Sequence, residues 1–175
     1  MKKVRYIMLM LGALLAAACR DVPVVEVAES QVDRLKEDMI TANRYMVVGE
    51  DTKIEAYIER RGWKMQCLDG GTRVMETRVG KGAPVVAKDS AEVAYTMETL
   101  SGRTVYSLRR QRVMVGRGEP MRGIDLALQH LHYGSTARLI LPSEQAYGLM
   151  GDGGAIGHRE ILVVDIKEIT PIGRQ

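Results

Sequence analysis

The sequence has few of the residues that build metal sites and disulfide frameworks. Its 175 residues include two cysteines, Cys19 and Cys67, and three histidines. These residues do not show the spacing of metal ligands, since His130 and His132 lie two apart at the end of a predicted helix. The sequence therefore predicts no bound metal.

Motifs for nucleotide binding and for nucleophilic catalysis are also missing. The glycines between Gly151 and Gly157 match neither a dinucleotide-binding nor a phosphate-loop pattern, and they predict a flexible loop. No serine stands in a nucleophile elbow with a matching histidine and acid. We therefore expect no cofactor and no covalent catalysis.

An excess of basic residues is absent from most of the chain. The 25 Lys and Arg exceed the 22 Asp and Glu by three, and all three extra positive charges lie within residues 2–5. Without that segment the charges balance, and no basic surface for nucleic acid is predicted.

Residues 1–18 are expected to be a cleaved secretory signal peptide. A basic start precedes an apolar run over residues 7–15, which is too short to span a bilayer. The small residues 16–18 before Cys19 resemble the lipobox of bacterial lipoproteins. That resemblance implies lipidation of Cys19 and an extracytoplasmic, membrane-anchored protein of the periplasm or cell envelope. The alternative is an ordinary cleaved signal with a free Cys19. Acylation would leave Cys67 without a disulfide partner.

The segment after the signal is predicted to contain a tether and two helices. Residues 19–29 form the tether, and residues 30–62 form an N-terminal helical segment. Near-helical apolar spacing predicts one helix from about residue 30 to 47, ended by Gly49. A second helix is predicted to start at Thr52 and to end before Gly62.

Residues 63–175 are predicted to form one α+β domain. Its main helix is indicated by the i, i+4, i+7 spacing of Ile124, Leu128 and Leu131, with Gly134 as the terminal glycine. Such a helix lies across a sheet, and the space between them is either solid core or a pocket. Strand-like runs occur at residues 63–67, 73–79, 93–97, 103–108, 113–115, 138–141 and 161–169. The order predicts five or six antiparallel strands around one helix.

Residues 72–169 resemble the FKBP-type peptidyl-prolyl cis-trans isomerase domain along its whole length. The order and spacing of the motifs carry the resemblance: V-A-Y-T at 93–96, S-G-R-T-V-Y-S at 101–107, M-R-G-I at 121–124, A-Y-G at 146–148 and L-V-V-D-I at 162–166. It implies an antiparallel sheet wrapped on one short helix, and isomerisation of X-Pro bonds in exported polypeptides.

The resemblance also implies the residues of the site. The donors to the substrate carbonyls would be the backbone N–H of Met121 and the hydroxyl of Tyr147. The residues lining the pocket would be Tyr95, Val105, Tyr106, Val113, Ile124, Ile156 and Val164. Proline-containing polypeptides or unfolded exported proteins would be the partners, and the oligomeric state is left open.

The site departs from the family's aromatic pattern, because the chain contains no phenylalanine. The family's tryptophan is Ile124, and its aspartate is Tyr106. Smaller side chains lining the pocket would weaken proline binding by about 1 kcal/mol or more for each aromatic residue replaced. The sequence thus leaves two main functions open: an isomerase of full or weakened activity, or a non-catalytic FKBP-fold lipoprotein that acts as a polypeptide-binding chaperone or assembly factor. A third alternative is a purely structural lipoprotein that makes its contacts through the helices of residues 30–61.

Overall fold

The computed structural model of the chain describes residues 29–173. The expected signal peptide, most of the tether and Cys19 lie outside the described residues. Contacts divide the chain into two units between Ala42 and Asn43. The sheet and the candidate site belong to the second unit.

A single helix, α2 (Glu29–Arg61), occupies the region where two helices were predicted. The predicted break at Gly49 is wrong, because one glycine inside a helix costs only about 1 kcal/mol and Gly49 keeps a negative φ. Thr52 does not cap a new helix. Its hydroxyl donates to the carbonyl of Val48 at 2.9 Å, one turn earlier. The true end comes at Arg61, where Gly62 has the positive φ of a C-terminal glycine.

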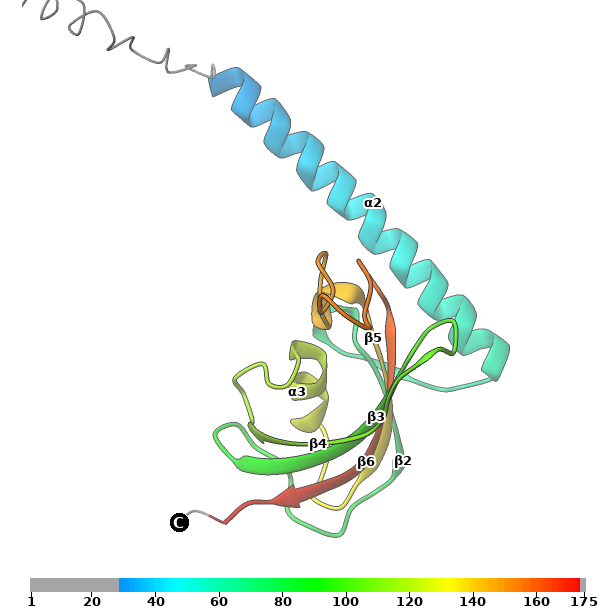
Figure 1. Cartoon of the computed structure of the whole chain (residues 1–175), viewed down its shortest axis with the longest axis vertical. Coiled ribbons are helices and arrows are strands. Elements are labelled where there is room, and N and C mark those ends of the chain that lie inside the picture. The colour runs from blue at the N-terminus through cyan, green and yellow to red at the C-terminus, as the bar shows by residue number, and fades with distance from the viewer. Residues whose placement is uncertain (1–28, 174–175) are drawn as a thin grey trace, which may run out of the picture. The chain divides into compact units, whose positions relative to one another are not determined.

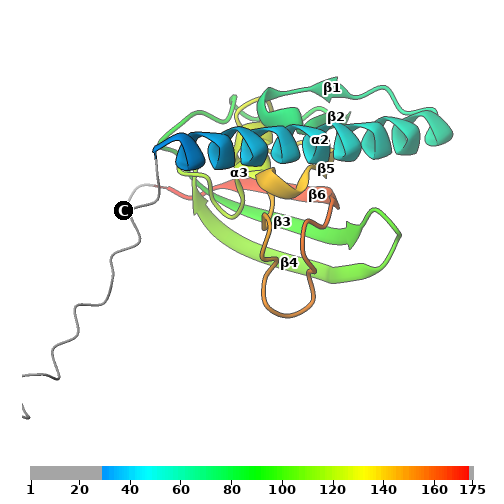
Figure 2. The ribbon, with the colours of Figure 1, turned by 90° about the horizontal axis from the view of Figure 1, so that it is seen from above.

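Six antiparallel strands form one sheet in the order β1–β2–β5–β6–β3–β4 (Figure 2). The strands are β1 (Gln66–Cys67), β2 (Arg73–Arg78), β3 (Ser90–Thr99), β4 (Thr104–Met114), β5 (Thr136–Leu141) and β6 (Leu162–Pro171). One short helix, α3 (Arg122–Leu128), lies against the sheet (Figure 1). The predicted α+β class, with an antiparallel sheet around one helix, is confirmed.

Two details of β4 and α3 differ from the prediction. Most of the runs at 103–108 and 113–115 falls in one strand, β4, which covers Thr104–Met114 and continues through the polar residues between them. Helix α3 ends at Leu128, although Leu131 is still buried in the core. Gly134 therefore does not end the helix. It lies in the turn before β5, where its φ of 84° suits glycine.

The alternation of side chains along the strands gives the sheet two apolar faces. On β5, Leu139 and Leu141 point into the cluster that contains α3, whereas Ile140 between them points to the other face. Ile54, Tyr57 and Ile58 of α2 pack on that other face. The last turns of α2 are therefore part of the domain core.

A buried arginine adds polar links between α2 and the sheet. The side chain of Arg73 on β2 is only 7% exposed. Its Nε donates to Glu55 at 2.9 Å, and its Nη2 donates to Asp51. Since a buried charge is costly unless it is paired, these two carboxylates fix α2 to β2.

Candidate functional site

All nine residues predicted for the site lie in or against one apolar cluster between α3 and the sheet. They come from β3, β4, β6, the start of α3 and the loop after β5, although up to 69 residues separate them in the chain. The set is Tyr95, Val105, Tyr106, Val113, Met121, Ile124, Tyr147, Ile156 and Val164. The topology of the fold brings them together.

The nine residues separate into a buried group and a group at the surface. Six are at most 4% exposed, namely Tyr95, Val113, Met121, Ile124, Ile156 and Val164. Val105, Tyr106 and Tyr147 are partly buried and pack on these six. A ligand approaching from solvent would therefore meet these three side chains first.

Irregular pairing in β4 puts two neighbouring residues on the same cluster. Consecutive residues of a regular strand point to opposite faces, yet Val105 and Tyr106 both pack against the core. The register between β3 and β4 shifts twice, between Tyr95 and Met97 and between Met97 and Glu98. Bulges of this kind redirect side chains next to functional sites. The sequence contained no signal for these shifts.

Tyr95 and Tyr147 bring two phenol groups to the cluster, and the pKa of each is raised. Burial, together with the nearby hydroxyl of Tyr106, raises the pKa of Tyr147 to about 12. Burial also raises the pKa of Tyr95, whose hydroxyl donates to Gln111 at 3.4 Å. Both phenols are therefore neutral at physiological pH, and the hydroxyl of Tyr147 can donate a hydrogen bond.

Arg109 brings a positive charge to this surface, and the sequence analysis did not predict it. It faces Tyr95 across the β3–β4 pair, and its guanidinium lies over the ring of Tyr106 at 4.8 Å from the centroid. Arg109 lowers the pKa of Tyr95 and of Tyr147, against the larger effect of burial. Among the described residues, no carboxylate forms an ion pair with it.

The second predicted donor lies at the start of α3. Met121 is the N-cap residue, with an extended backbone, and its carbonyl accepts from Asp125 N–H at 3.0 Å. Its own N–H has no hydrogen-bond partner within residues 29–173. The carboxylate of Asp125, only 5% exposed, accepts from the backbone N–H groups of Gly116 and Gly118 and fixes the preceding turn. The amide of Met121 thus follows a turn that hydrogen bonds hold in place, and it makes no hydrogen bond of its own within the described residues.

The loop that carries Tyr147 and Ile156 is held at several points. Asp152 accepts from the N–H groups of Gly154 and Ile156, and these bonds lower the pKa of Asp152. Arg103, at the turn before β4, donates to the carbonyl of Ala155 at 2.7 Å. The glycine-rich segment that the sequence predicted to be flexible is therefore internally bonded.

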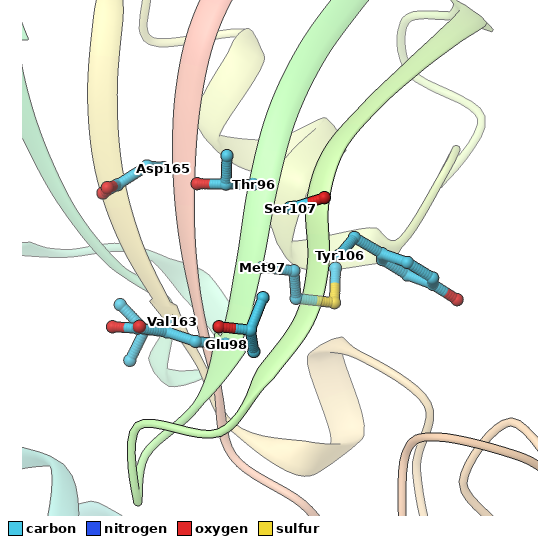
Figure 3. A pocket seen from close by; sticks show the side chains of 8 residues that line it. Thr96, Met97, Glu98, Tyr106, Ser107, Val163 and Asp165 are labelled. Carbon is cyan, nitrogen blue, oxygen red and sulfur yellow. The ribbon is translucent and has the colours of Figure 1, made fainter.

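A cavity of about 270 Å³ lies beside the site, on β3, β4 and β6. Thr96, Glu98 and Asp165 give it a polar lining, and the ring of Tyr106 extends away from Thr96 and Asp165 (Figure 3). Tyr106 therefore borders both this polar cavity and the apolar cluster.

Within the described part of the chain, no three His, Cys, Asp or Glu side chains gather as metal ligands. No helix in the same part has the length and apolarity needed to cross a bilayer.

The fold and the site together define the FKBP class of domain, and comparison with known proteins agrees. The sequence profile of the FKBP-type peptidyl-prolyl cis-trans isomerase family matches residues 81–168, half of the chain. The chain is 28% identical over 102 residues to peptidyl-prolyl cis-trans isomerase Fkbp12 of Drosophila melanogaster, covering 55% of this chain and 94% of that protein. It is 35% identical over 94 residues to the macrophage infectivity potentiator of Trypanosoma cruzi, covering 52% of this chain and 47% of that protein.

A solved structure shows the same fold. The peptidyl-prolyl cis-trans isomerase from Pseudomonas syringae pv. tomato matches with a TM-score of 0.58 and 27% identity, covering 74% of this chain and 93% of that one. This chain therefore belongs to the FKBP-type peptidyl-prolyl cis-trans isomerase family. It spans less than half the length of several curated relatives, for example 26% of FK506-binding protein 3 of Yarrowia lipolytica.

Proposed function

We propose that the protein catalyses cis-trans isomerisation of X-Pro bonds in polypeptides. Rotation of a peptide bond has a barrier of roughly 18–20 kcal/mol, because it breaks the amide resonance. The reaction makes and breaks no covalent bond, so an enzyme needs only to favour the twisted amide. An apolar surface that excludes water favours the twisted amide, since it separates less charge than the planar one.

The arrangement of donors around one apolar cluster carries this proposal. The amide of Met121 and the hydroxyl of Tyr147 belong to separate elements that meet at the cluster containing Ile124. We propose that these two donors bind the carbonyl groups that flank the isomerising bond. Val105 and Tyr106 would contact the proline side chain. Each hydrogen bond is worth about 0.5–1.5 kcal/mol, and only the part gained in the twisted state contributes to rate.

One observation favours a second candidate, a domain that binds polypeptides without isomerising them. The side chains in the positions of the family's aromatic walls are aliphatic, and Val113, Ile124 and Val164 are buried and packed together. Such packing leaves Tyr106 and Tyr147, rather than an aromatic pocket, as the contact surface. A flatter surface could hold an unfolded segment while giving a twisted amide little advantage.

A protease-coupled assay on an X-Pro peptide distinguishes the two candidates. We expect the full chain to accelerate isomerisation, and Tyr147→Phe to lower kcat/KM about three- to tenfold, as expected for the loss of one hydrogen bond. A rate equal to the uncatalysed rate would reject the isomerase. Displacement of the amide resonances of Tyr106 and Tyr147 by the same peptide would then support the binding domain.

We also propose that Cys19 carries a lipid that anchors the protein outside the cytoplasm, where its clients would be exported polypeptides. The signal-like segment 1–18 and the small residues before Cys19 support this proposal. Mass spectrometry of the protein from membranes is expected to show an acylated N-terminal cysteine. A Cys19→Ser variant should remain in the soluble fraction, and an unmodified Cys19 in the wild type would contradict the proposal.

A further inference from the structure

A buried glutamate on α2 bonds to both ends of the loop that carries Tyr147. We infer that Glu50 is a positioning residue for the isomerase site, acting through that loop although it touches no predicted site residue. The inference rests on the proposed function in one respect, the role of Tyr147 as a donor. The rest of it depends on the contacts of Glu50, Ser143 and Arg159.

The carboxylate of Glu50 is shared between two residues of the loop. One oxygen, Oε2, accepts from the backbone N–H of Ser143 at 2.9 Å. The other, Oε1, accepts from the hydroxyl of Ser143 at 2.7 Å and from Nε of Arg159 at 3.3 Å. Glu50 is 8% exposed and Ser143 is 1% exposed, so water cannot readily replace these bonds.

The same two residues hold the backbone next to Tyr147. The N–H of Gly148 donates to the carbonyl of Ser143 at 2.7 Å. The carbonyl of Gly148 accepts from the N–H of Arg159 at 3.1 Å. The peptide units on both sides of Gly148 are therefore fixed by the pair that Glu50 joins, and these bonds set the position of Tyr147.

The backbone of Arg159 adopts a conformation that needs support from its surroundings. Its φ of 51° lies in the left-handed region, which is unfavourable for a residue with a side chain. Such a conformation persists only where surrounding bonds impose it. The bonds of Arg159 to Glu50 and to Gly148 are suited to do so.

The attachment of α2 to the sheet does not depend on Glu50. Asp51 and Glu55 bind Arg73, and Ile54 and Ile58 pack into the apolar cluster on the other sheet face. Loss of the Glu50 carboxylate should therefore leave the helix docked and release the loop. A positioning role can on this basis be separated from a general role in stability.

The test compares three variants of the full chain at a temperature where all are folded. Glu50→Ala should lower kcat/KM for an X-Pro peptide about tenfold and should displace the amide resonances of Tyr147 and Gly148. Glu50→Gln keeps one acceptor oxygen for Ser143 but loses the charge opposite Arg159, so its effects should be intermediate. Ile58→Ala is the matched control, because it removes apolar packing of the same helix and none of the bonds that Glu50 makes.

The outcomes separate this inference from the proposed function. It is overturned if the Tyr147 and Gly148 resonances stay in place in both Glu50 variants, or if Ile58→Ala changes them and kcat/KM to the same extent. If Glu50→Ala does not fold, Glu50→Gln decides by the same two measurements. If the wild type shows no isomerisation, the proposed function fails, and the resonances still decide whether Glu50 holds the loop.

Discussion

Truncation of Ile54 to alanine tests whether the last turns of α2 belong to the core of the domain. Ile54 is fully buried, and it packs in one cluster with Ile140 and Val163 on the sheet face opposite α3. The substitution removes three carbon atoms, which is worth about 2.4 kcal/mol at about 0.8 kcal/mol per methylene-sized group. A cavity left behind would add to this, and we expect a loss of about 3–4 kcal/mol.

The single tryptophan provides a reporter for this experiment. Trp63 is half-buried against the same cluster, with its ring 5.8 Å from the ring of Tyr57. Urea unfolding followed by tryptophan fluorescence should show the loss in free energy, and thermal unfolding should show Tm about 10 °C lower. Val48→Ala, at a 58% exposed site on the same helix, should change stability by less than about 0.5 kcal/mol. A loss of less than about 1 kcal/mol in Ile54→Ala would refute the packing of α2 on the sheet.

Three further predictions concern charge and pH. Because burial raises the pKa of Tyr147 to about 12, kcat/KM should stay constant from about pH 6 to about pH 10, and a fall below pH 9 would contradict a neutral donor. Arg109 has no carboxylate partner among the described residues, so it can pair with a glutamate of the substrate. The kcat/KM for a peptide with glutamate before the proline should therefore be about threefold higher than for one with lysine, and Arg109→Gln should abolish this difference. Although burial opposes it, hydrogen bonds from Arg138 and Lys167 lower the pKa of Asp165. The wild type should therefore lose stability as the pH falls below about 4, and Asp165→Asn should lose less in urea titrations over that range.

Motif order predicted the fold because each motif encodes a local backbone feature. The alternation of Val93, Tyr95 and Met97 in β3, the apolar start of β6 and the spacing of Ile124 and Leu128 each indicated an element and its buried side chains. The arrangement of these elements was implied by the resemblance of the motifs, in their order and spacing, to the FKBP family. Seven of the nine residues predicted for the site lie in the motifs that carry the family resemblance, and Val113 and Ile156 lie outside them. The fold brings all nine to one cluster.

The features that sequence reasoning missed depend on contacts between distant residues. Glu50 and Ser143 are 93 residues apart, so no local pattern links them. Gly49 and Thr52 resemble a helix stop and start, but packing of Ile54 on the sheet favours one continuous helix over two. The register shifts in β4 depend on its pairing with β3, and the position of Arg109 over Tyr106 follows from those shifts.

Exchange spectroscopy of an X-Pro peptide with a substoichiometric amount of the full chain tests the central claim most directly, because it measures cis-trans interconversion without a coupling protease. The account predicts exchange faster than in the free peptide, reduced by Tyr147→Phe, with peptide-induced shifts at Tyr106, Met121 and Tyr147. Exchange at the rate of the free peptide, with the protein shown to be folded, would contradict an isomerase built on this site.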